Sequence, residues 1–84
     1  MKYFLYAIKD TKVGFMPPFI QVNEAVAIRE FGNMINKVGS QLNINYNDME
    51  LYELGSFDLN TGEIVSEVRY VIKGADVYKV GEAE

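Results

Sequence analysis

The strongest constraint on the fold is an apolar run at the start of the chain, followed closely by a turn and two prolines. Residues 2–9 include six consecutive apolar side chains, from Tyr3 to Ile8. Aromatic and β-branched residues favour strands, and an unbroken apolar run is typical of a strand buried on both faces. Asp10 to Gly14 has the composition of a turn. We therefore expect residues 2–9 to form a central strand.

The two prolines limit what can follow the turn. Pro17 and Pro18 fix φ and remove two N–H donors, so residues 15–22 cannot form a central strand. We expect an edge strand or an extended crossing over the core. In either case Pro17-Pro18 would end the sheet pairing and hold Phe15 or Phe19 against the core.

One amphipathic helix is predicted over residues 24–38. Asn23 is a candidate N-cap, and Gly39 is expected to end the helix. Gly32 lies in the middle, at a cost of about 1 kcal/mol relative to alanine, which close packing against a strand would explain. The apolar side chains recur with the helical period at Ala27, Ile28, Phe31, Met34, Ile35 and Val38.

The second half of the chain is predicted to be mostly strand. Residues 40–48 are polar and rich in asparagine, so we expect a loop there. A strand region should follow over residues 49–59, with Gly55 placed for a β-bulge. Asn60-Thr61-Gly62 predicts a hairpin turn, because its glycine suits a positive φ.

A return strand is expected over residues 64–73, then a last edge strand over residues 75–80 and a frayed acidic tail over residues 80–84. Three side chains of the return strand should face the same way: Val68, Tyr70 and Ile72. Together these elements predict an α+β fold, a small antiparallel sheet of four to five strands with one helix packed on one face.

Length and composition point to one small domain spanning residues 1–84. With 84 residues and no cysteine, the chain has no disulfide or thiolate metal site to support its core. No segment has the length or composition of a signal peptide or a membrane span, so we expect no membrane partner and a cytoplasmic location.

The absence of histidine and cysteine also bears on catalysis. It removes the commonest general base and the commonest metal ligands, and no glycine-rich phosphate loop is present. The segment from Asp58 to Glu63 resembles a calcium loop only faintly, and a hairpin turn accounts for the same residues. We therefore expect no enzyme activity, no metal and no cofactor.

Charge and aromatic side chains suggest where nucleic acid would bind. The net charge of −4 argues against tight non-specific binding to DNA, but residues 48–67 carry six acidic side chains and no basic one, and a negative total can hide a basic face elsewhere. Single-stranded nucleic acid is held by aromatic platforms beside basic side chains. If the first strand and residues 68–73 were neighbours, several tyrosine and basic side chains would share a face. The alternative is that the tyrosines line the core. The candidate contact residues are Tyr6, Lys9, Lys12, Arg69 and Lys73.

Self-association is a further expectation. A small sheet with a proline-bearing edge and an exposed C-terminal strand offers a surface for a second copy, and a homodimer would bury what an 84-residue core cannot.

Four motifs stand out: a Y-x-I-x-D strand at residues 6–10, a G-x-x-P-P-F segment at residues 14–19, an A-x-R-x-F helix at residues 27–31 and an L-x-x-L-G-x-F-D-x-x-T-G hairpin at residues 51–62. Together they resemble the small nonstructural protein of gokushovirus-type microviruses, which are phages with single-stranded DNA genomes. The chain departs from the family pattern in the polar loop 39–48 and in its longer C-terminal strand. The resemblance covers nearly the whole chain and implies a non-capsid protein of the replication cycle, described as DNA-binding.

Two hypotheses about function follow. In the first, the chain is a phage accessory protein of genome replication that binds single-stranded DNA or the phage or host replication and packaging proteins, in the cytoplasm of the bacterial host. In the second, it is a protein-interaction module, acting on the replisome or the host. The docking surface would then be the aromatic proline segment: Phe15, Met16, Pro17, Pro18 and Phe19.

Overall fold

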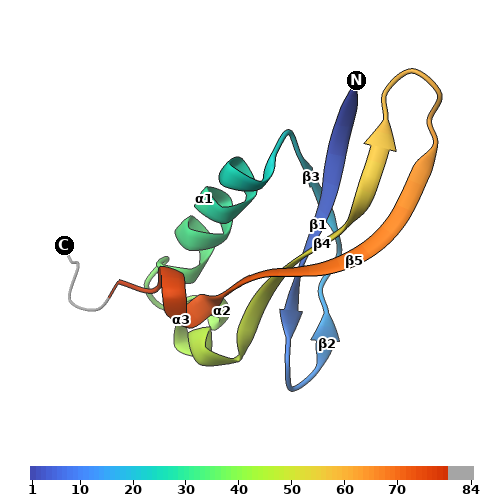
Figure 1. Ribbon diagram of the computed structural model, residues 1–84. Helices are drawn as coiled ribbons and strands as arrows, with labels where there is room; N and C mark the ends of the chain where they lie inside the picture. The colour runs from blue at the N-terminus through green and yellow to red at the C-terminus, as the bar shows by residue number, and fades with distance from the viewer. Residues whose placement is uncertain (80–84) are drawn as a thin grey trace.

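The computed structural model describes residues 1–79 and has the predicted α+β fold. All strand pairs are antiparallel, and the sheet order is β2-β1-β4-β5, with β3 also paired to β1 (Figure 1). The strands are β1 (Lys2–Asp10), β2 (Gly14–Phe15), β3 (Phe19–Gln21), β4 (Met49–Asp58) and β5 (Ile64–Lys73). The helical segments are α1 (Glu24–Ile35), α2 (Gln41–Ile44), the 3₁₀ turn η1 (Tyr46–Asp48) and α3 (Gly74–Val77).

The central position predicted for the first strand is confirmed. β1 pairs with β4 along its whole length and with β2 and β3 on its other side. Pro17 and Pro18 are exposed and lie between the two short strands, so they interrupt this edge of the sheet, as their missing N–H groups require. Of the two aromatic candidates beside them, Phe19 packs against the core, whereas Phe15 is about half exposed.

Helix α1 covers one face of the sheet and begins where the sequence predicts. The Asn23 side chain accepts a hydrogen bond from the Val26 N–H at 2.9 Å, which confirms the N-cap. The predicted end at Val38 is wrong. The helix ends at Ile35, because Asn36 donates its side-chain amide to the Gly32 carbonyl, and the chain then turns away.

The predicted loop over residues 40–48 is also wrong, because this stretch folds into α2 and η1. Ser40 acts as an N-cap and accepts a hydrogen bond from the Asn43 N–H at 3.1 Å. The Asn43 side chain donates to the Ile35 carbonyl at 2.9 Å and ties the segment to α1. Serine and asparagine therefore act here as caps and links between helices rather than as loop formers.

The last predicted strand, residues 75–80, is helical as far as Val77, in α3. Gly74 is buried, and a Cβ at this position would clash with the Tyr46 carbonyl, so glycine lets α3 pack closely on η1. The prediction that Gly32 packs closely against a strand is wrong, because a Cβ there would make only an ordinary contact, at 3.7 Å, with Val77 of α3. The tail predicted at residues 80–84 lies outside the described residues.

The hairpin of β4 and β5 contains the predicted turn and bulge. Asp58 accepts hydrogen bonds from the N–H groups of Asn60 and Thr61, which hold the pKa of its carboxyl below the usual range. Gly55 has a φ of +153° and lies where the register with both neighbouring strands shifts.

A second register shift separates Tyr70 from Ile72. Tyr70 pairs with Tyr52 and Ile72 with Leu51. Leu51 and Tyr52 are consecutive and point to opposite faces, and paired residues share a face. The prediction that Tyr70 and Ile72 face the same way is therefore wrong, because Val71 is an extra residue between them.

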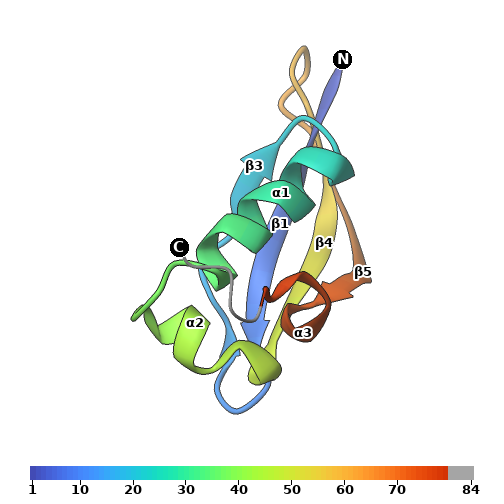
Figure 2. The same cartoon turned by 90° about the vertical axis from the view of Figure 1, so that its left-hand side faces the viewer.

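The core lies between α1 and the sheet. Its fully buried large side chains are Tyr6, Phe31, Ile35, Met49 and Leu51, from β1, α1 and β4. Helices α2 and α3 close the end of this layer (Figure 2). Tyr46 and Tyr78 stack there with ring centroids 3.7 Å apart.

Candidate nucleic-acid interface

The two faces of the sheet differ in what covers them. On one face the side chains of Tyr6, Ile8 and Leu51 pack against α1, which lies across β1 in Figure 2. Neighbours in a strand point to opposite faces, so Ala7, Lys9 and their cross-strand partners occupy the other. None of the described helices packs on this second face, which we call the open face.

A row of aromatic rings crosses the open face. Phe15 of β2 meets Tyr52 of β4 edge to face, with centroids 5.2 Å apart, and Tyr52 meets Tyr70 of β5 in the same way at 5.7 Å. The small Ala7, opposite Tyr52 in β1, leaves room for the first contact to span the intervening strand. Phe15 and Tyr70 remain 49% and 46% exposed, so their rings are accessible from solvent.

Basic side chains border this row. The Lys9 ammonium lies 5.5 Å from the centroid of Phe15 and 5.7 Å from that of Tyr52, within cation–π range of both. Lys9 and Lys73 flank Glu50 in the strand register. Glu50 also accepts a hydrogen bond from the Tyr52 hydroxyl at 3.1 Å, and burial together with this bond raises the pKa of Tyr52.

The structure does not bring the five predicted contact residues onto one face. β1 and β5 are separated by β4, so the first strand and residues 68–73 are not neighbours. Lys9 and Lys73 lie on the open face, and Lys12 is exposed in the turn after β1. Tyr6 is fully buried beneath α1, so for this residue the core alternative is the correct one.

Arg69 also faces α1 rather than the open face. Its Nη2 atom lies 2.6 Å from Glu24 in the first turn of the helix and 2.8 Å from Glu53 of β4. These hydrogen bonds raise the pKa of Arg69. The residue thus ties the start of α1 to the sheet, and its charge is largely neutralised by two carboxylates.

Beside this cluster, the Tyr6 hydroxyl is buried without a hydrogen-bond partner in the part of the chain that the structure describes. An unpaired buried hydroxyl costs about 1–3 kcal/mol. Burial, helped by the nearby carboxylates of Glu53 and Glu24, raises the pKa of Tyr6 to about 12.

We expect Tyr6→Phe to raise the free energy of unfolding by about 1 kcal/mol at neutral pH, because it removes the unpaired hydroxyl and keeps the ring. The effect should also depend on pH. The pKa of Tyr6 is higher in the folded state than in the unfolded state, so ionisation of its hydroxyl lowers the free energy of unfolding. The wild type therefore keeps its full stability below about pH 10 and loses part of it as the pH rises towards 12. Urea titrations of both proteins at pH 7 and pH 11 should show the wild type losing more stability; an equal loss would contradict the assignment.

The residues of the alternative docking segment do not form one surface. Met16 and Phe19 pack against the core, Pro17 and Pro18 are exposed at the edge, and Phe15 belongs to the aromatic row. The segment therefore divides between the core and the open face.

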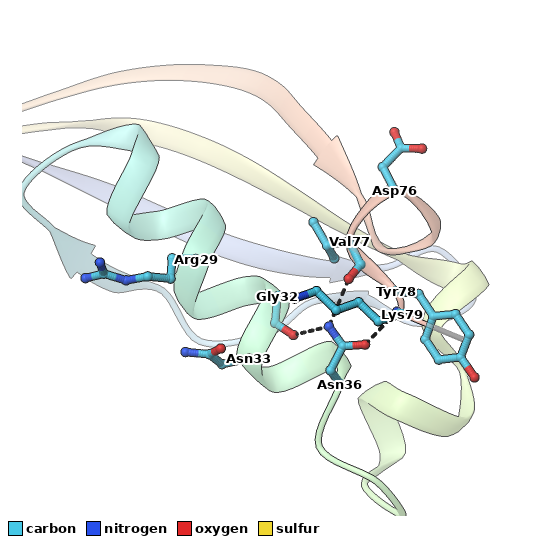
Figure 3. A pocket seen from close by; sticks show the side chains of 8 residues that line it. All are labelled: Arg29, Gly32, Asn33, Asn36, Asp76, Val77, Tyr78 and Lys79. Atoms are coloured by element: carbon cyan, nitrogen blue, oxygen red, sulfur yellow. Dashed lines mark hydrogen bonds between the residues drawn. The ribbon is translucent and has the colours of Figure 1, made fainter. Parts of the chain in front are cut away.

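A cavity of about 300 Å³ lies between α1 and α3 with the residues that follow each of them (Figure 3). Asn36 lines it and donates to the carbonyls of Gly32 and Val77 while accepting from the Lys79 N–H. The amide group is thus engaged in joining the two elements. We interpret Asn36 as a structural link rather than a ligand-binding group.

Among the described residues, no group of acidic side chains is arranged to hold a metal ion. No described helix is long and apolar enough to cross a membrane. The aromatic row with Lys9 is therefore the best-defined candidate site in the part of the chain that the structure covers.

Comparison with known families adds to this geometry. Residues 3–77 match the family described as Phage ORF5 protein, which covers most of the chain. The chain belongs to the Phage ORF5 protein family. No significant match was found among curated proteins or among solved structures. As a Phage ORF5 protein, the chain is a phage protein, in agreement with the coarser part of the resemblance seen in the sequence.

The aromatic row of this Phage ORF5 protein is not evident from the sequence. Phe15 has the features of a packing or docking residue beside the prolines, and Tyr52 and Tyr70 lie in strands whose relative register depends on the extra residue at Val71. One signal was available in β4, where strand alternation makes Tyr52 face away from Leu51 and therefore away from the helix.

Proposed function

We propose that this phage protein is a nonstructural accessory protein of genome replication that binds single-stranded DNA on the open face of its sheet. The observation that supports this proposal is the row of Phe15, Tyr52 and Tyr70 with Lys9 among the rings. Exposed aromatic rings on an uncovered sheet form stacking platforms for unpaired bases.

Stacking would supply most of the affinity. Each base stacked on an aromatic side chain contributes about 1–3 kcal/mol. Three basic residues, Lys9, Lys12 and Lys73, lie near the row or in the adjoining turn, and Glu50 offsets part of their charge. A protein of net charge −4 with so few phosphate contacts is suited to unpaired bases and poorly suited to duplex DNA, in which the bases are stacked on one another.

The proposal extends to the origin and setting of the protein. The family supports a phage protein, and we propose more specifically the gokushovirus-type microviruses, acting in the cytoplasm of the bacterial host. A single-stranded DNA genome would present the unpaired bases that the open face fits. Phage or host replication proteins would be further partners at this stage of the cycle.

A titration with a labelled single-stranded oligonucleotide tests the proposal. With up to three phosphate contacts, the slope of log K against log salt should be about −2. Lys9→Glu should weaken binding about tenfold, because it removes a phosphate contact and places a carboxylate over the rings.

Lys37→Glu is the matched control, since Lys37 is exposed after α1 and away from the open face. It should bind as the wild type does. Absence of binding at low salt, or equal effects of the two charge reversals, would contradict the proposal and favour the protein-interaction hypothesis.

A further inference from the structure

The two edges of the sheet differ greatly in how well they are protected against pairing with another chain. One edge consists of β2 and β3, two and three residues long, with Pro17-Pro18 between them. Short strands and prolines are the usual means of preventing pairing with another chain. The other edge is β5, ten residues long, without proline and unpaired on its outer side within residues 1–79.

An unusually large part of the apolar side-chain surface of β5 is exposed to solvent. Four of its large apolar side chains are substantially open to solvent: Ile64 at 61%, Val65 at 49%, Val68 at 61% and Tyr70 at 46%. A long, exposed, apolar edge strand pairs readily with another strand. The residue pattern of β5 indicates which strand would fit it.

The side chains of β5 complement those of a second β5 that runs antiparallel to it. We propose that β5 pairs antiparallel with β5 of a second copy, about a two-fold axis that passes between the two Val68 residues. In this register three of the facing pairs are apolar and two join opposite charges, which are favourable cross-strand pairs. The pairs, each between one copy and the other, are Val68 with Val68, Glu67 with Arg69, Ser66 with Tyr70, Val65 with Val71, Ile64 with Ile72 and Glu63 with Lys73.

The charged pair at the centre is available in each copy. Glu67 is exposed and makes no ion pair within the described residues. Arg69 contacts Glu24 and Glu53 through Nη2 alone, which leaves guanidinium donors for the carboxylate of the second copy. If the register shifted by one or two residues, Glu67 would no longer face Arg69 of the second copy.

The bulge at Val71 limits how far a regular ladder extends. The register with β4 also shifts between Ser66 and Arg69, opposite Leu54, so we expect the pairing between copies to be centred on Val68 and its immediate neighbours. Ser66 and Tyr70 pair with open-face residues of β4, so the open faces of the two copies would lie on the same side of one continuous sheet. The case for a second copy at this edge rests on the matched apolar and charged residues, and it does not depend on whether the protein binds DNA.

Disulfide crosslinking tests this register directly, because the chain has no cysteine of its own. Val68→Cys should form a disulfide-linked dimer in a glutathione redox buffer, since the two residues would face each other across the axis with Cα atoms about 4.5–5.5 Å apart. Val65→Cys is the matched control at an equally exposed position of the same strand. Its two copies would lie about 20 Å apart and should remain unlinked.

A second measurement keeps the proposal open to contradiction without any disulfide. Glu67→Lys should raise the dimer dissociation constant about tenfold in sedimentation equilibrium, because a lysine offers no acceptor to the remaining guanidinium N–H groups of Arg69 in the other copy. Asp76→Lys is the matched control. It makes the same charge change on α3, away from the β5 edge, and should leave the dimer dissociation constant unchanged. A wild-type monomer at every soluble concentration, or crosslinking of Val65→Cys as readily as Val68→Cys, would overturn the proposal.

Discussion

Replacing Gly55 with alanine is expected to destabilise the protein by about 3 kcal/mol or more. Gly55 has a φ of +153°, a region that side-chain-bearing residues rarely adopt, and a Cβ there would clash with the Val65 carbonyl of β5. Backbone cannot move aside as a flexible side chain would, so the hairpin must distort. Urea denaturation followed by circular dichroism measures the loss.

Gly62→Ala provides the control for backbone strain alone. Gly62 also has a positive φ, +78°, but no atom lies within 4 Å of the position its Cβ would take. Its replacement should cost about 1–2 kcal/mol. If both variants lose the same stability, the close approach of the Val65 carbonyl to Gly55 is not a significant constraint.

The second large effect concerns binding. The double substitution Phe15→Leu/Tyr70→Leu, at the two exposed rings of the row, is expected to weaken single-stranded DNA binding at least 30-fold. Two stacking platforms at about 1 kcal/mol or more each give that factor, and leucine preserves apolar volume without a ring face. Fluorescence anisotropy with a labelled oligonucleotide measures the change.

The stacked pair of Tyr46 and Tyr78 supplies the control, since these rings pack against the core and not on the open face. Tyr46→Leu/Tyr78→Leu should alter the melting temperature while leaving the affinity of the folded protein unchanged. Equal losses of affinity in the two double variants would remove the aromatic row as the binding surface.

The sequence predicts the elements whose signal is local. The apolar run of β1, the Asn23 cap and the 60–62 turn are each determined by a few adjacent residues, and the structure contains all three. The bulge at Gly55 is likewise predicted and confirmed, because a glycine inside a strand often marks a bulge or a close approach of backbone.

Features that depend on contacts between distant residues could not be predicted in this way. Asn36 ends α1 early and bonds to Val77, far along the chain, and α3 forms where Gly74 can approach Tyr46. The predicted DNA-contact residues divide between two faces because β4 lies between β1 and β5. No pattern within a single segment could reveal that arrangement.

The central place of β1 has a consequence for synthesis on the ribosome. This strand is translated before β4, its longest partner, which follows only after α1, α2 and η1. Until then its backbone is paired on one side alone, by the short strands β2 and β3. The apolar side chains of β1 therefore have only the α1 part of their core neighbours until β4 is translated, and the sheet can be completed only once the β4–β5 hairpin is available.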